Sequence, residues 1–167
     1  LISKIVVACS ENKKDQKIIK LCQKKKISYF IGSETNVLDR YYKANQYFNG
    51  DIIIRITSDC PLMDPKLIDK FINLFFKKKV DYLTNIISRT YPDGLDVEVF
   101  NKNALHIAWK NSKHAYDIEH VTPYLIRSKK IKKFNVSLDK DFSDNIWTLD
   151  FKKDLLQRLK KYKSKVA

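Results

Sequence analysis

Short apolar runs alternate along this chain with longer stretches in which apolar residues recur every three or four positions. The short runs are rich in β-branched residues and predict strands at residues 4–8, 28–31, 51–56 and 80–84. The longer stretches predict helices at residues 14–25, from position 35 or 36 to about 48, and from 65 onward. Alternation of this kind is typical of βαβ units and a largely parallel sheet. The sequence therefore predicts an α/β fold.

The second half of the chain predicts further strands and helices. Residues 95–100 alternate in a way that predicts a half-exposed strand, and Asn101 is placed to cap a helix that continues through Trp109. Pro123 would kink or delay the helix predicted at residues 117–127, unless regular helix begins near Thr122. The last predicted elements are strands at residues 134–137 and 145–149 and a closing helix at 152–162. A chain of 167 residues accommodates them in a single domain, residues 1–167.

Residues 51–65 carry clear local signals. Their first part, DIIIRI, is nearly all β-branched, as expected of a strand buried on both faces. Asp64 and Pro65 then provide an N-cap and a proline at the first helical position. Because an unpaired charge inside such a strand would cost several kcal/mol, we expect Arg55 to have an acidic partner or to reach a ligand.

The formal net charge of +14, from 33 basic and 19 acidic residues, would suit a nucleic-acid binder. Only five of the basic residues are arginine, however, and surfaces that clamp phosphates or read bases favour the bidentate arginine fork. The lysines cluster at the ends of predicted helices or in the following loops, where the helix dipole favours cations. We therefore expect a solvated lysine surface.

Cysteine usage and hydropathy predict a cytoplasmic protein. Three cysteines without a close C-x-x-C pair support neither a disulfide framework nor a zinc knuckle. No apolar run approaches the roughly 18 residues of a membrane span, and the first residues do not resemble a signal peptide. We expect neither nucleic acid nor a membrane among the partners.

Two aspartates directly follow predicted strands, Asp59 after the third and Asp150 after the last. In open α/β sheets, ligands bind at the carboxyl ends of the strands. Mg²⁺ is usually held by one or two carboxylates, with substrate phosphates and water completing its shell. Asp59 and Asp150 could provide those carboxylates. Alternatively, Asp59 supports the turn before Pro61 and Asp150 caps the closing helix.

Several segments, taken in order, resemble one family. They are GSE (32–34), NVLDRY (36–41), RITSDCPLMDP (55–65), RTYPDGLDVEVF (89–100), EHVTPY (119–124) and WTLD (147–150). Together they resemble the cytidylyltransferases that make CMP-activated sugars, most closely the branch that serves spore-coat polysaccharide synthesis. The resemblance implies a three-layer α/β/α sandwich, the Rossmann-like fold of nucleotide-diphospho-sugar transferases.

The same resemblance implies an activity, namely transfer of CMP from CTP to a sugar hydroxyl with release of pyrophosphate. It implies that Asp59 and Asp150 are catalytic and bind Mg²⁺ as its protein ligands. Attack on the α-phosphorus of a triphosphate requires a cation that neutralises developing charge and orients the leaving group. CTP and a sugar are the expected partners, and pairing into a homodimer is an expectation from the resemblance alone.

Five more residues are candidates for substrate binding by resemblance: Arg40, Arg89, Asp96, Glu98 and His120. Arg40 would contact a phosphate or sugar, or else pair with an i,i+4 neighbour on its helix. Arg89, Asp96 and Glu98 lie on a hairpin that would close over the sugar, or else flank an exposed turn at residues 92–94. His120 would bind a substrate hydroxyl, or else serve as a cap or packing residue.

A glycine-rich phosphate loop has no counterpart in this sequence. The only glycines are Gly32, Gly50 and Gly94, too far apart to form one. The resemblance places that loop and the first strand ahead of residues 4–8, so we expect a truncated domain with little or no transferase activity by itself. Two other functions stay open: a glycosyltransferase of related fold, although Asp59 lacks the usual D-x-D partner, and a non-catalytic basic binding domain.

Overall fold

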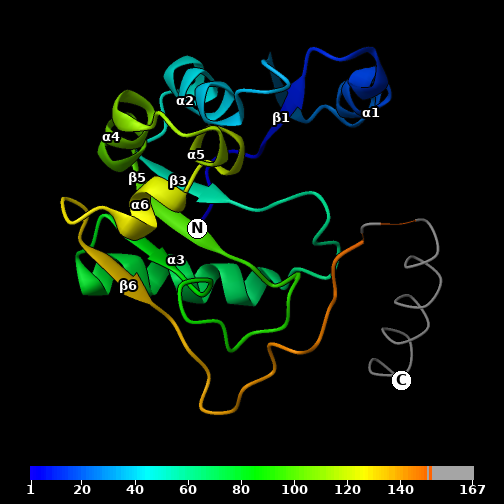
Figure 1. Ribbon diagram of the computed structural model, residues 1–167. Coiled ribbons are helices and arrows are strands. Elements are labelled where there is room, and N and C mark those ends of the chain that lie inside the picture. Colours follow the sequence, from blue (N-terminus) through cyan, green and yellow to red (C-terminus); the bar gives the residue numbers. More distant parts are fainter. Residues whose placement is uncertain (150, 152–167) are drawn as a thin grey trace, which may run out of the picture. The chain divides into compact units, whose positions relative to one another are not determined.

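The computed structural model describes residues 1–149 and 151 (Figure 1). Asp150 and the closing helix predicted at residues 152–162 lie outside the described residues. The part described is a mixed α/β fold of six strands and six α-helices, which confirms the predicted fold class. The chain divides into two compact units, each built from two stretches of sequence. Unit 1 is Leu1–Ile53 with Phe100–Lys133, and unit 2 is Ile54–Val99 with Phe134–Ala167.

Unit 1 begins with a βαβ element. Strands β1 (Val6–Ser10) and β2 (Ser28–Gly32) are parallel, with Val6 opposite Ser28 and Ser10 opposite Gly32. Helix α1 (Gln16–Lys25), preceded by one 3₁₀ turn, connects them and buries Ile19 and Cys22. This parallel pair with its helical crossover confirms the pattern predicted for the first 32 residues.

The rest of unit 1 is helical. Helix α2 (Val37–Phe48) packs against α4 (Lys102–Asn111) and α5 (Ala115–His120), and the short α6 (Pro123–Arg127) follows α5 (Figure 1). The side chain of Asn36 accepts a hydrogen bond from the Asp39 N–H, and that of Asn101 accepts one from the Ala104 N–H. Both asparagines therefore cap their helices as predicted.

Unit 2 contains most of a four-stranded sheet and helix α3. The sheet has the order β3 (Ile52–Arg55), β5 (Glu98–Asn101), β4 (Tyr82–Thr84), β6 (Lys133–Asn135). Helix α3 (Pro65–Lys78) packs against β4, and the Asp64 side chain caps it by accepting a hydrogen bond from the Lys66 N–H. The predicted N-cap and N1 proline are thus confirmed.

Two burial predictions are wrong because strand position in the sheet decides burial. Residues 95–100 were expected to be half-exposed, yet positions 97–100 are at most 1 % exposed, since β5 has a neighbour on each side. Residues 51–56 were expected to be buried on both faces. They are only half-buried or exposed, because β3 has a single neighbour, β5.

Two predicted elements also differ in form. The helix expected at residues 117–127 is broken into α5 and α6, because Val121 adopts a positive φ of 71° and Pro123 restarts the helix. The strand expected at residues 145–149 is wrong as well. Within residues 145–149 only Ile146 forms a bridge, which is parallel to Asp93, and the other four residues are not in a strand.

Candidate functional site

Asp59 lies in the loop between β3 and α3, four residues beyond the end of the strand. The loop is tightened by hydrogen bonds from the Cys60 N–H to the Thr57 carbonyl (3.2 Å) and from the Met63 N–H to the Cys60 carbonyl (3.3 Å). The Cys60 thiol donates to Asp59 Oδ1 at 3.6 Å, and Thr57 Oγ1 lies 3.2 Å from the sulfur. A compact turn therefore holds the Asp59 carboxylate in half-buried surroundings.

The Cys60 thiol is a donor in this turn and not a nucleophile. It is buried, and burial raises its pKa to about 11, with the neighbouring Asp59 and Asp96 carboxylates adding to the effect. A thiol with such a pKa stays protonated at neutral pH.

Two other segments of unit 2 are hydrogen-bonded to each other and to the Asp59 loop. The Leu149 N–H donates to the Asp59 carbonyl at 2.8 Å. The Asp93 N–H donates to the Asn145 carbonyl (2.9 Å), and the Trp147 N–H donates to the Asp93 carbonyl (2.6 Å). The loop at 57–60, the turn at 92–94 and the segment at 145–149 are thus joined by main-chain bonds.

Gly94 allows the turn at 92–94 to lie close to the segment at 145–149. Its φ is +105°, and a Cβ there would lie 2.7 Å from the main-chain carbonyl carbon of Trp147. No side chain fits this backbone and this spacing without moving main chain.

Arg89 and Asp96 face each other beside this junction. The guanidinium donates two hydrogen bonds to the Asp96 carboxylate, at 2.5 and 2.8 Å, and one long bond to Asp93 at 3.5 Å. These contacts raise the pKa of Arg89, chiefly through the hydrogen bond with Asp96. All three side chains are partly exposed, so they can also be reached by a small molecule.

Glu98 is placed differently from these residues, because its side chain is 1 % exposed. One carboxylate oxygen accepts a hydrogen bond from Arg55 and the other accepts one from the Tyr82 hydroxyl at 2.6 Å. The three residues come from the neighbouring strands β3, β5 and β4. Of the two partners expected for Arg55, an acid or a ligand, the acid is present. The substrate role of Glu98 stays a prediction, and its carboxylate is already bonded on both oxygens.

The remaining candidates, Arg40 and His120, belong to unit 1. Arg40 donates to the Ser33 carbonyl at 2.7 Å, while its buried Nε has no hydrogen-bond partner within the described residues. Among the described residues, Arg40 forms no ion pair with another residue of α2. His120 is exposed at the end of α5, and its ring contacts that of Tyr116. The substrate roles of Arg40 and His120 stay predictions.

Comparison with known proteins identifies the family. The profile of the cytidylyltransferase family matches residues 1–163. The chain is a member of the cytidylyltransferase family. Its sequence is 44 % identical over 131 residues to an uncharacterised protein of Methanocaldococcus jannaschii, covering 77 % of this chain and 52 % of the relative. It is 36 % identical over 122 residues to the spore coat polysaccharide biosynthesis protein SpsF of Bacillus subtilis, covering 72 % of this chain and 50 % of the relative.

Solved structures agree on the fold of this cytidylyltransferase. A cytidylyltransferase from Leptospira borgpetersenii matches with a TM-score of 0.85 and 33 % identity, over 90 % of this chain and 64 % of that one. A molybdopterin-guanine dinucleotide biosynthesis protein A from Archaeoglobus fulgidus matches at a TM-score of 0.56 and 16 % identity, over 90 % and 75 % of the two chains, and supports the Rossmann-like fold alone. The chain spans about half the length of the curated relatives it matches.

The donor chemistry of the Asp59 carboxylate fits a hard divalent cation. Residues 1–149 and 151 contain no group of three or more His, Cys, Asp or Glu side chains that could enclose a metal. Within the same part of the chain, Asp59 forms no ion pair with a lysine or arginine, so its carboxylate is not neutralised. One or two carboxylates with open positions suit Mg²⁺ that also binds phosphates.

The sequence places Cys60 next to Asp59 but does not predict that its thiol donates to the carboxylate. Sequence reasoning missed Tyr82, because its bond to Glu98 depends on the order β5-β4. No helix in the described part of the chain is both long enough and apolar enough to cross a membrane.

Proposed function

We propose that this cytidylyltransferase takes part in transferring CMP from CTP to a sugar, for a surface polysaccharide or glycan. Family membership supports nucleotidyl transfer, and the similarity to a spore coat polysaccharide biosynthesis protein of Bacillus subtilis supports the sugar. The observation that carries the proposal is the junction of the Asp59 loop, the turn at 92–94 and the segment at 145–149 in unit 2. It places the Asp59 carboxylate, which forms no ion pair among the described residues, beside a polar, partly exposed hairpin.

In this proposal Asp59 and Asp150 bind Mg²⁺ through their carboxylates. The bond from the Leu149 N–H to the Asp59 carbonyl supports this pairing, since Asp150 is the next residue in the sequence. The bound cation supplies charge neutralisation at the phosphates during attack by the sugar hydroxyl. The Cys60 thiol, donating to Asp59 Oδ1, keeps that carboxylate oriented.

The hairpin supplies the sugar-binding groups. Arg89, Asp93 and Asp96 offer donors and acceptors that are partly exposed, and Arg89 holds both acids in place. Arg40 is proposed as a phosphate or sugar contact because its buried Nε lacks a partner among the described residues. Glu98 acts through Arg55, which it orients with the help of Tyr82.

The isolated 167 residues are proposed to turn over little or no substrate. The chain spans about half of its curated relatives and contains only three glycines, none close enough to another to form a phosphate loop. Binding is therefore a better first test than turnover.

The test is thermal protection of the chain by CTP with and without Mg²⁺, in wild type, Asp59→Asn and Asp144→Asn. Asp144 is an exposed acid of the same unit and serves as the matched control. Protection that requires Mg²⁺ and is lost only in Asp59→Asn supports the proposal. Equal protection of all three proteins, with or without Mg²⁺, would refute the role of Asp59.

A further inference from the structure

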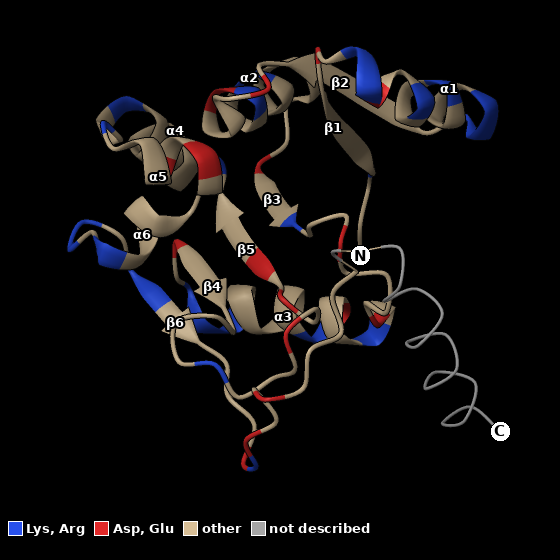
Figure 2. Cartoon of the chain, turned by 45° about the vertical axis from the view of Figure 1, so that its right-hand side comes forward, with Lys and Arg blue, Asp and Glu red and all other residues tan. Residues whose placement is uncertain are grey.

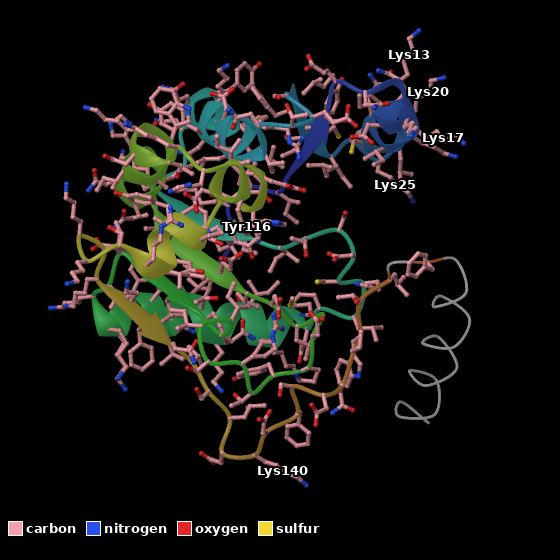
Figure 3. The ribbon with its side chains drawn as sticks, in the orientation of Figure 1. Lys13, Lys17, Lys20, Lys25, Tyr116 and Lys140 are labelled. Atoms are coloured by element: carbon pink, nitrogen blue, oxygen red, sulfur yellow. The ribbon has the colours of Figure 1, made fainter. Side chains whose placement is uncertain are left out.

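Helix α1 presents a basic face to solvent. The seven lysines between residues 13 and 26 are all exposed: Lys13, Lys14, Lys17, Lys20, Lys24, Lys25 and Lys26. Figure 2 shows several basic stretches along the helix, and Figure 3 shows the side chains of Lys13, Lys17, Lys20 and Lys25 extending away from it. The sequence had suggested only a cluster at the helix end. In the structure the lysines follow the whole helix.

The opposite side of α1 fixes this orientation. Ile19 and Cys22, 5 % and 3 % exposed, bury that side in unit 1. At 100° per residue, Lys17, Lys20 and Lys24 then lie together on the outward side. We call these three lysines, together with Leu21 beside them, the α1 basic face.

Acidic residues do not neutralise this face. Asp15 is the only acid between residues 13 and 26, and its carboxylate accepts a hydrogen bond from the Ser10 N–H. Glu34 is bonded through both oxygens to the Asn12 amide. Across residues 1–149 and 151, none of the seven lysines takes part in an ion pair.

Apolar groups lie beside the positive charge. Leu21, at the edge of the α1 basic face beside Lys17, is 54 % exposed, and Ile18 next to it is 43 % exposed. A helix that mixes exposed lysines with exposed aliphatic side chains can lie on an anionic bilayer, with its charges at the headgroups and its apolar groups below them. Nucleic acid is less well matched, because α1 has neither arginine for phosphate forks nor an aromatic residue for stacking.

We propose that the α1 basic face docks this protein on a membrane surface rich in anionic phospholipid. The bilayer would be contacted and not crossed, and the contact is independent of the proposed CMP transfer. The proposal replaces the expectation from sequence that no membrane is a partner. The lysines on one face of α1 complement anionic headgroups, and the exposed Leu21 suits the apolar layer below them. Together they favour a lipid surface as the partner.

The test is co-sedimentation of the full 167-residue chain with vesicles of phosphatidylcholine, alone or with about one third phosphatidylglycerol. Binding to the anionic vesicles that weakens with added salt is expected, with little binding to the neutral ones. Absence of binding to anionic vesicles at low salt would overturn the proposal.

Two matched variants distinguish vesicle binding by the α1 basic face from vesicle binding by net charge alone. The triple variant Lys17→Gln, Lys20→Gln, Lys24→Gln is expected to bind about a hundredfold more weakly, since each lysine near an anionic bilayer is worth about fivefold. The control removes the same charge from exposed positions on α3, through Lys66→Gln, Lys70→Gln and Lys77→Gln. If the control loses as much affinity as the α1 variant, binding is a matter of net charge and the proposal is wrong.

Two further measurements distinguish lipid from nucleic acid. Leu21→Ser leaves the charge unchanged, so weaker vesicle binding by this variant supports burial of Leu21 in the bilayer. A single-stranded RNA is titrated against the same proteins. RNA binding that is lost in the α1 triple variant, with vesicle binding unaffected by it, would assign the face to nucleic acid instead.

Discussion

The backbone N–H of Leu149 donates a 2.8 Å hydrogen bond to the backbone carbonyl of Asp59, across ninety positions of sequence. This bond brings the segment at 145–149 to the loop that follows β3, and both belong to unit 2. Because it joins main chain to main chain, it does not depend on either side chain. The approach of these two segments is therefore built on a backbone contact.

Gly94→Ala is expected to destabilise unit 2. The alanine would have to adopt a φ of +105° with its Cβ 2.7 Å from the Trp147 main chain. The strained φ alone costs about 1–3 kcal/mol, and the close contact adds to it. Urea unfolding measures the loss, with Gly50→Ala as control, because a Cβ at Gly50 would come close to the movable side chain of Asn45 and lie at an ordinary 3.8 Å from the Ile52 carbonyl oxygen. Equal losses in both variants would contradict the conclusion that the φ of Gly94 and its close approach to Trp147 require glycine.

Tyr82→Phe is expected to cost about 1–3 kcal/mol, because it leaves one oxygen of the buried Glu98 carboxylate without its hydroxyl donor. Glu98→Gln should cost more, since it removes the buried negative charge that accepts the hydrogen bond from Arg55. The double variant should lose less than the sum of the two. Chemical unfolding of wild type, the two single variants and the double variant gives the double-mutant cycle. Tyr29→Phe is the control, because the hydroxyl of Tyr29 accepts a hydrogen bond from the exposed Gln23. Strict additivity would show that the three residues do not act as a network.

Local signals made the helix starts predictable. The side chains of Asn36, Asp64 and Asn101 bond backbone N–H groups two or three residues ahead, so each cap needs no information from elsewhere in the chain. The run of apolar and polar positions likewise specified α1 and β2 to within a few residues. The position of Asp59 after a predicted strand already made it a candidate, and family motifs added the hairpin, which periodicity alone did not select.

Sheet order and side-chain partners were not predictable in this way. Glu98 lies in an alternating stretch, which suggested an exposed position, yet β5 became an inner strand because β3 and β4 pair on either side of it. The bidentate pair of Arg89 with Asp96 likewise depends on the path of the turn at 92–94. Partners that are set by tertiary pairing leave little trace in a single sequence.

Asp117 should make folding stability depend on pH in the acid range. Its carboxylate is fully buried, and hydrogen bonds from Arg127 are the main reason that its pKa is lowered. The stabilisation is complete above the unfolded pKa of about 3.9 and is lost as pH falls through the lower folded value. Stability curves of wild type and Asp117→Asn measured from pH 7 downward should therefore converge in acid. Parallel curves would show that the Asp117–Arg127 pair does not make stability depend on pH.

Cys60 should resist alkylation in the folded protein. Its pKa of about 11, raised mainly by burial, leaves very little thiolate at pH 8, whereas an unfolded cysteine titrates near 8.5. Iodoacetamide should therefore modify Cys60 at least about a hundredfold more slowly in the native chain than in denaturant, because the thiolate is the reactive form. Mass spectrometry of the peptide that contains Cys60 measures both rates, and the native rate should climb about tenfold per pH unit towards pH 11. A native rate equal to the denatured one would mean that the thiol is ionised at neutral pH, and it could then no longer be the donor to Asp59 Oδ1.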